Sequence, residues 1–273
     1  MPTQNEGNDA ANNAPDRQSL APEIATVMEC MPELLPFLPE LLQDLPDFSG
    51  ATPDVLDVLS EYGLAAESRV LDLGCGRGDV ARAVAERFAV RVDGIDAFPP
   101  FVAAARQRAA AAGLAERCRF TQGDLRTALQ PAVPYDAVLY LALGPLLGDA
   151  ATTIGALRQT VRPGGAMVID DAYLADGATA PPAWPGYRSL AATEAGLTAC
   201  GDVIQFRRPS HAEAFAVAAE AAIERRVEEL CARHPEAAPW LRAYRRREAE
   251  EFELLRPGGP LVPCVWLLVR GDR

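Results

Sequence analysis

The chain of 273 residues contains no lysine, and all 26 of its basic residues are arginine. A mechanism that needs a lysine, as a Schiff base or as a general base, is therefore excluded. No apolar run reaches the roughly 18 residues of a membrane-spanning helix, which predicts a protein without a membrane partner. The six cysteines form no Cys-x-x-Cys pair. That pattern argues against a zinc cluster, predicts no metal site and fits a reducing cytoplasm.

The basic residues are also outnumbered, because 38 acidic residues against 26 basic ones give a formal net charge of −12. Binding to nucleic acid depends on a basic surface, so a nucleic-acid partner is not expected. The densest basic run, Arg242 to Arg247, is followed closely by glutamates and favours a charge-laced helix face. The first 20 residues are polar and have no apolar signal core, which predicts a disordered tail and a cytoplasmic protein.

The most informative stretch that is present runs from Val70 to Gly78 and reads Val-Leu-Asp-Leu-Gly-Cys-Gly-Arg-Gly. An apolar strand meets an acid and then three glycines at alternate positions, before an alanine-rich helix. Glycines allow the backbone a positive φ and a close approach to a ligand. The acid, Asp72, would repel a phosphate and suits the cationic end of a ligand, such as an amino-acid ammonium. Dinucleotide-binding turns usually read Gly-x-Gly-x-x-Gly, which differs from this spacing.

Further strands follow at regular intervals. Residues 91–96 predict a second strand that ends at Asp96, and residues 118–122 predict a third that leads to Gly123, Asp124 and Leu125. Residues 135–141 and 166–170 predict a fourth and a fifth strand. Ligands of open α/β sheets bind outside the carboxyl ends of the strands, where Asp72, Asp96 and Asp124 all fall. Each acid alone reads as a solvated loop residue, but the three together indicate a site.

The order and spacing of these pieces, over roughly residues 65 to 175, resembles the class I S-adenosylmethionine-dependent methyltransferases. The resemblance implies an α/β fold, with a seven-stranded Rossmann-like sheet, helices on both faces and an antiparallel seventh strand. It implies S-adenosylmethionine as cofactor, with Asp96 near the ribose and Asp124 near the adenine. The residues that it assigns to the cofactor are Asp72, Gly74, Cys75, Gly76, Asp96, Ala97, Phe98, Gly123, Asp124, Leu125 and Tyr140.

Two helical segments flank this core. Residues 21–62 contain a near-repeat of Pro-Glu-Leu-Leu at 32–42 and predict short helical turns, either a lid over the ligand or a layer packed on the sheet. Residues 63–273 then form the methyltransferase domain. A helical insertion, residues 210–254 with a break at Pro235, separates a sixth strand at 202–206 from a seventh at 261–269. One of its faces carries an apolar stripe that either caps the pocket, packs on the sheet flank or forms a homodimer surface.

The predicted reaction is transfer of a methyl group from S-adenosylmethionine to a small-molecule acceptor, with release of S-adenosylhomocysteine. The Asn-Pro-Pro-Tyr motif that marks methylation of amide or base nitrogens is absent after the fourth strand. Catalytic residues stay open: the weak candidates are Tyr140, Tyr173 and His211, with Asp170, Asp171 and His234 behind them. Two other classes stay open as well, a non-catalytic S-adenosylmethionine-binding protein and a nicotinamide-dependent oxidoreductase.

Overall fold

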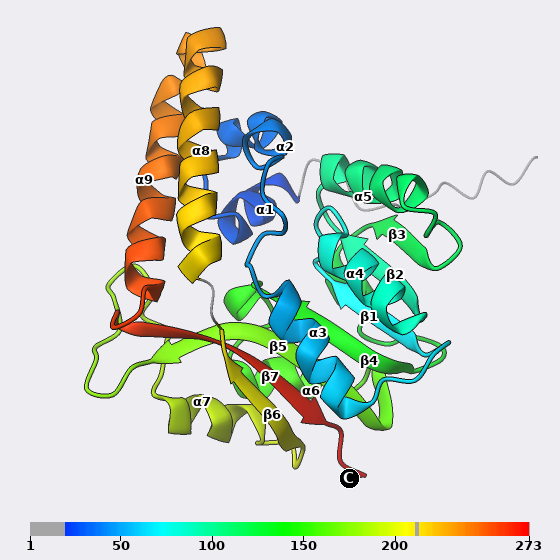
Figure 1. Ribbon diagram of the computed structural model, residues 1–273. Helices are drawn as coiled ribbons and strands as arrows, with labels where there is room; N and C mark the ends of the chain where they lie inside the picture. The colour runs from blue at the N-terminus through cyan, green and yellow to red at the C-terminus, as the bar shows by residue number, and fades with distance from the viewer. Residues whose placement is uncertain (1–19, 211–212, 273) are drawn as a thin grey trace, which may run out of the picture.

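The structure is a computed structural model that describes residues 20–210 and 213–272. Its centre is a seven-stranded sheet in the order β3-β2-β1-β4-β5-β7-β6 (Figure 1). The strands are β1 (Arg69–Leu73), β2 (Arg91–Asp96), β3 (Cys118–Gln122), β4 (Tyr135–Leu141), β5 (Val161–Leu174), β6 (Val203–Pro209) and β7 (Leu261–Val269). β7 runs antiparallel to β5 and β6, whereas the other pairings are parallel. The predicted sheet with an antiparallel last strand is confirmed.

Helices cover both faces of the sheet. One face carries α3 (Thr52–Tyr62), α4 (Asp79–Phe88) and α5 (Pro99–Ala111); the other carries η2 (Leu125–Ala128), η3 (Gly144–Leu147), α6 (Ala150–Leu157) and α7 (Leu190–Leu197). Successive strand residues point to opposite faces. Val70 accordingly packs with α3, α4 and α5, while Leu71 and Leu73 pack with α6 and α7. This double burial explains why the strands read as continuous apolar runs.

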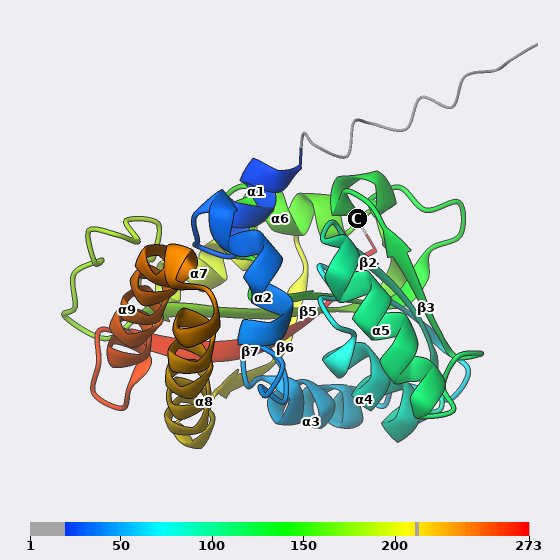
Figure 2. The ribbon, with the colours of Figure 1, turned by 90° about the horizontal axis from the view of Figure 1, so that it is seen from above.

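A third group of helices stands beside the sheet. It contains α1 (Ala21–Val27), η1 (Pro32–Phe37), α2 (Leu38–Leu41), α8 (Glu213–Arg233), η4 (Pro235–Ala237) and α9 (Ala238–Leu255). α8 and α9 form an antiparallel pair, α2 lies next to α8, and α1 lies next to η1 (Figures 1 and 2). The short helical turns of the N-terminal segment, the insertion before β7 and the break at Pro235 are therefore confirmed.

The apolar stripe of α8 is covered within the chain. Ala219, Ile223, Val227 and Leu230 are buried in one cluster with leucines of η1 and α2. Ala212, which continues the same three- and four-residue spacing toward the N-terminus, lies outside the described residues. Because the N-terminal segment already occupies this face, the buried stripe offers no free surface to a second copy of the chain.

Two strands differ from prediction at both ends. β6 begins one residue later than predicted and extends to Pro209, and β5 runs from Val161 to Leu174 instead of from Ala166 to Asp170. β5 is longer because β7 pairs with it from Ala166 to Leu174. Asp170 consequently lies inside a strand, paired with Leu141 at the last position of β4. Among the helices of the described residues, none combines the length and apolar character needed to cross a bilayer.

Candidate functional site

The glycine-rich turn joins β1 to α4 at the point where the strand order reverses between β1 and β4. Gly74 and Gly76 adopt φ of +70° and +52°, which side chains with a Cβ disfavour. A Cβ on Gly74 would lie 2.5 Å from the Leu143 side chain, and one on Gly76 would lie 2.7 Å from the Phe48 ring. The turn therefore requires glycine for both its conformation and its close packing.

Asp72 and Asp96 lie on either side of this turn. Asp72 is buried, with 3% of its surface exposed. Burial, and then the charge of Asp96, raises the pKa of Asp72 to about 8. The Asp96 carboxylate accepts from the backbone N–H groups of Gly76 at 2.9 Å and Phe98 at 2.8 Å. Burial raises the pKa of Asp96, although these two hydrogen bonds oppose the shift. A cationic ligand would compensate the Asp72 carboxylate.

Asp124 is the N-cap of η2 and faces a different partner. Its carboxylate accepts from the Arg126 backbone N–H and forms an ion pair with the Arg126 guanidinium at 2.8 Å. Arg126 also pairs with Glu23 of α1 at 2.6 Å. Burial works against ionisation of Asp124, but the bonds from Arg126 hold its pKa below the ordinary value. Asp124 thus lies at the expected strand end with its carboxylate already engaged.

A cavity of about 870 Å³ opens at the carboxyl ends of β1, β2, β4 and β5. It extends beneath the N-terminal segment, the loop after β5 and the α8–α9 pair. The cofactor residues expected from sequence that line it are Asp72, Gly74, Cys75, Gly76, Asp96, Ala97, Phe98, Asp124 and Leu125. Gly123 and Tyr140 are not among its lining residues. Nine residues from three separate strand ends are thereby brought together in one cavity.

The catalytic candidates expected from sequence do not gather there. Tyr140 is 3% exposed, donates to the Gly144 carbonyl at 3.0 Å and has its pKa raised to about 12 by burial. Tyr173 packs edge-on against Trp266, and His234 packs against Phe37. His211 lies outside the described residues. The tyrosines miss the cavity because strand side chains alternate between faces, so a neighbouring position points the other way.

Asp170 and Asp171, which the sequence offered as further weak candidates for a base, do line the cavity. Burial raises the pKa of Asp170 to about 7 and that of Asp171 to about 6. Across from them, α9 contributes Glu248 and Glu251, and burial also raises the pKa of Glu248 to about 7. We call these four side chains the β5–α9 carboxylates. Sequence reasoning placed Glu248 and Glu251 on a solvated face, and the structure corrects this because both face the cavity.

A second feature missed in the sequence is Arg77, inside the glycine turn. It is 3% exposed, donates to the backbone carbonyls of Leu42 at 2.5 Å and Leu45 at 2.8 Å, and pairs with Asp79 at 2.9 Å. Its guanidinium also lies 4.5 Å from the Phe48 ring centroid. Arg77 therefore ties the turn to the N-terminal segment. Its position in the glycine motif indicated a residue near the ligand site, but the motif does not predict that Arg77 binds the N-terminal segment.

Three other residues join the segments above the cavity, and we call them the Glu29–Trp184–Arg247 contact. The Trp184 indole N–H donates to Glu29 at 3.0 Å, and Arg247 forms an ion pair with the same carboxylate. The Arg247 guanidinium lies 3.6 Å from the Trp184 ring centroid. This contact links the end of α1, the loop after β5 and α9, so three distant parts of the sequence meet over one cavity.

Comparison with known proteins gives consistent results. Residues 70–165 match the family described as methyltransferase domain. The chain is 34% identical over 114 residues to a trans-aconitate 2-methyltransferase from Azoarcus sp. (strain BH72), covering 41% of this chain and 42% of the relative. It is 31% identical over 117 residues to a ubiquinone biosynthesis O-methyltransferase from Xylella fastidiosa (strain M23), covering 43% and 47%. The chain thus spans less than half the length of these relatives.

Solved structures match over more of the chain. An S-adenosylmethionine-dependent methyltransferase from Geobacter sulfurreducens, in complex with S-adenosylhomocysteine, has a TM-score of 0.71 at 22% identity. That match covers 85% of this chain and 96% of the other. The [4+2]-cyclase SpnF has a TM-score of 0.66 at 19% identity, covering 94% and 97%. These likenesses establish the fold, which hosts more than one chemistry.

Proposed function

Residues 70–165 belong to a methyltransferase domain of the class I, S-adenosylmethionine-dependent type, and on that premise we propose that the protein methylates a small-molecule acceptor. The products are the methylated acceptor and S-adenosylhomocysteine. The observation that carries this proposal is the meeting of Asp72, Asp96 and the Gly74–Gly76 turn in one cavity. Neither a nicotinamide-dependent oxidoreductase nor a non-catalytic binding protein is favoured by these residues or by the named relatives.

The residues fit the proposed cofactor at each end. The buried Asp72 carboxylate suits the ammonium of the methionine part, and the Gly74–Gly76 backbone allows close approach. Asp96 would accept from the ribose hydroxyls, with Ala97 and Phe98 beside it. Asp124, Leu125 and the neighbouring Gly123 would border the adenine, although Arg126 must then share the Asp124 carboxylate. We no longer assign Tyr140 to the cofactor, because its side chain lies outside the cavity lining.

The sulfonium of the cofactor supplies an electrophilic methyl group. The protein's part is then to align the acceptor with that methyl, and proximity and orientation supply at most about 7–11 kcal/mol. The acceptor end of the cavity lies beyond Leu141 and Leu143, where the N-terminal segment, β5 and α9 converge. In this arrangement residues 21–62 act as a lid over the domain of residues 63–273, and Phe215 of the insertion lines the same cavity.

The proposal extends to partners and location. A small molecule is favoured over nucleic acid because twelve carboxylates and only three guanidinium groups line the cavity. We include no homodimer, since the α8 stripe is buried within the chain. A cytoplasmic location is supported by six free cysteines, none of them in a disulfide. In the glycine turn, burial raises the pKa of the Cys75 thiol well above its ordinary value, which disfavours a reactive thiolate there.

The test is a calorimetric titration with S-adenosylmethionine and, separately, with NAD. We expect micromolar-scale binding of the first and none of the second. Asp96→Ala should weaken S-adenosylmethionine binding by about 1–3 kcal/mol, because the ribose hydroxyls lose their acceptor. Asp57→Ala, an exposed acid on α3, is the matched control and should bind normally. Equal affinity of the Asp96 variant, with its fold intact by circular dichroism, would contradict the proposed site.

A further inference from the structure

The cavity contains two separate groups of carboxylates. Asp72 and Asp96 lie beside the glycine turn, and the pKa of Asp72 is raised first by burial and then by the charge of Asp96. The β5–α9 carboxylates form the second group. Three of them lie near Tyr187, whose pKa is raised first by burial and then by the charges of Asp171, Glu251 and Asp170. The ammonium of the methyl donor accounts for the first group, and its sulfonium carries one positive charge, which is too little for the four carboxylates of the second.

The arginines of the cavity do not neutralise the second group. Arg77 is paired with Asp79, Arg126 with Asp124 and Glu23, and Arg256 with Glu220 and Glu253. Among the described residues, no ion pair includes any of the β5–α9 carboxylates. Arg247 lies near enough to oppose the rise in the pKa of Glu251, but its own ion pair is with Glu29. A buried carboxylate without a counter-charge is costly.

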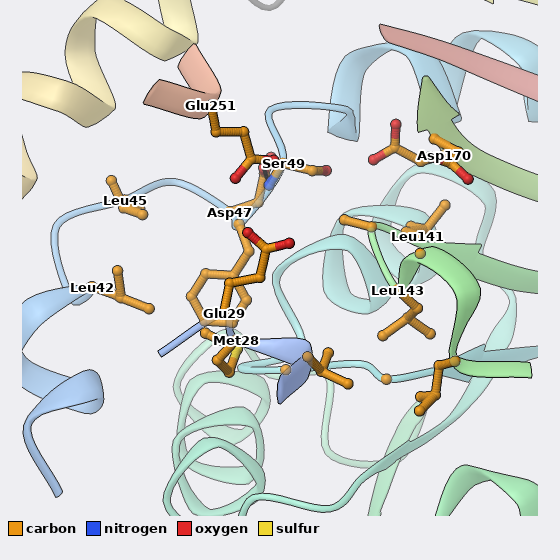
Figure 3. Close-up of a pocket in the computed structure, with 18 of the residues that line it drawn as sticks. Met28, Glu29, Leu42, Leu45, Asp47, Ser49, Leu141, Leu143, Asp170 and Glu251 are labelled. Atoms are coloured by element: carbon orange, nitrogen blue, oxygen red, sulfur yellow. Dashed lines mark hydrogen bonds between the residues drawn. The ribbon is translucent and has the colours of Figure 1, made fainter. Parts of the chain in front are cut away.

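Asp170 is the member of this group that points most clearly to a ligand. Its side chain is buried, with the residue 7% exposed, and its Oδ2 atom has no hydrogen-bond partner. Figure 3 shows this side chain reaching from β5 toward Ser49, while Glu251 extends from α9 toward the same part of the cavity. Asp170 is also paired in the sheet with Leu141, the residue that ends β4. It therefore lies at the end of the cavity that we assign to the acceptor.

Two other occupants are disfavoured. Within residues 20–210 and 213–272, no three histidine, cysteine or acidic side chains are arranged to hold a metal ion. An anionic acceptor would meet the same negative charges and would be repelled. The cavity is lined by apolar side chains, among them Met28, Leu42 and Phe252, together with the carboxylates. A ligand with a positive charge and an apolar body suits both kinds of side chain.

We infer that the methyl acceptor is an amine with an apolar body, bound as its ammonium ion through Asp170 with Glu251 facing it across the cavity. This inference rests on the proposed methyltransferase function and names its substrate class. Burial raises the pKa of Asp170 to about 7. The pKa of this carboxyl is therefore closer to that of an ammonium ion than the pKa of an ordinary aspartate is, and proton transfer from the ammonium to Asp170 costs less free energy.

The chemical step balances without a further reactant. The ammonium gives one proton to the Asp170 carboxylate and becomes a neutral amine. The nitrogen lone pair then forms a bond to the methyl carbon while the carbon–sulfur bond breaks, and its electron pair stays on sulfur. The products are a methylated ammonium ion and neutral S-adenosylhomocysteine. Asp170 afterwards returns its proton to solvent.

The experiment uses the full chain saturated with S-adenosylhomocysteine and a set of probes that share one apolar body. These are 2-phenylethylamine, 2-phenylethanol and 3-phenylpropanoic acid, extended by a panel of primary and secondary aliphatic amines. Binding is measured by calorimetry on this complex. Turnover is measured separately, with S-adenosylmethionine in place of S-adenosylhomocysteine, as acceptor-dependent formation of S-adenosylhomocysteine. We expect amines to bind and to be methylated, while the acid and the alcohol do neither. Binding of the acid or the alcohol, or no binding by any amine, overturns the inference.

Variants separate this inference from the proposed function. Asp170→Asn should weaken amine binding by about tenfold or more, the loss expected for a charge-assisted hydrogen bond, and leave S-adenosylhomocysteine affinity within about twofold. Glu251→Gln replaces the first variant if that one folds poorly, and it should also weaken amine binding. Asp176→Asn, an exposed aspartate after β5, is the matched control. Normal amine binding by both cavity variants overturns the role of these carboxylates, whereas absent cofactor binding in the unmodified protein refutes the proposed function instead.

Discussion

Replacing Asp170 by asparagine should stabilise the protein at neutral and alkaline pH, even though the residue lies in the site. In the folded protein, burial raises its pKa from 3.8 to about 7. The folded state therefore holds a proton that the unfolded state releases above about pH 4. Stability contributed by this residue consequently falls as the pH rises from about 4 to 7, and the loss persists above pH 7. At about 1.4 kcal/mol for each pKa unit, three units correspond to roughly 4 kcal/mol.

Only part of that loss is present at low pH, which makes the prediction specific. A pH of 5 is about one unit above the pKa of the carboxyl in the unfolded state, so the loss of folding stability is about 1.5 kcal/mol. The stability of Asp170→Asn relative to the unmodified protein should therefore improve by about 2.5 kcal/mol between pH 5 and pH 8. Any fixed cost of placing the asparagine amide in the cavity is the same at both pH values and does not affect this difference.

The assay is urea unfolding of the ligand-free protein, followed by circular dichroism at pH 5 and pH 8. Asp176→Asn serves as the control, because its side chain is exposed and its stability should track the unmodified protein at both pH values. If the Asp170 variant differs from the unmodified protein by the same amount at pH 5 and pH 8, the carboxyl does not titrate as argued. The buried carboxylate, with its unpartnered Oδ2 atom, would then not lower the free energy of unfolding at pH 8.

Two further predictions concern the segments around the cavity. Phe215→Ala should weaken acceptor affinity more than cofactor affinity, because Phe215 packs over Gly50 and lines the cavity away from the glycine turn. Calorimetric titration of the variant with each ligand tests this, and a larger loss of affinity for the cofactor contradicts it. Arg247→Gln should speed hydrogen exchange in α1 and η1, because the ion pair with Glu29 is lost, whereas Arg246→Gln, an exposed neighbour, should not. Unchanged exchange in the Arg247 variant would show that the contact does not hold the N-terminal segment.

The part of the site that could be predicted from the sequence is the part built from consecutive residues. Asp96 ends β2 and Asp72 is the last residue but one of β1, and parallel strands bring their carboxyl ends to one edge of a sheet, so their meeting follows from strand order alone. Tyr140, which the sequence placed at the cofactor, is not among the residues that line the cavity, because a strand end fixes a location but not which face a side chain takes. One residue further, Leu141 lines the cavity.

The acceptor end could not be predicted in this way. Glu248 and Glu251 reach the cavity from a helix whose place is fixed by packing of the α8–α9 pair and by β7 returning antiparallel along β5. Their spacing of three residues, next to Arg247, reads in one dimension like any solvated helix face. Asp170 likewise reads as a strand end, and only its pairing with both Leu141 and Val265 shows that it lies inside the sheet.

The N-terminal segment has a thermodynamic consequence because it borders both ends of the cavity. Through Leu42 and Leu45 it is held by Arg77 of the glycine turn, and through Ser49 it adjoins Asp170. A ligand that orders this segment from one end lowers the entropy that the second ligand must lose at the other. We therefore expect cofactor and acceptor to strengthen each other's binding by the same factor, since coupling between two sites is reciprocal.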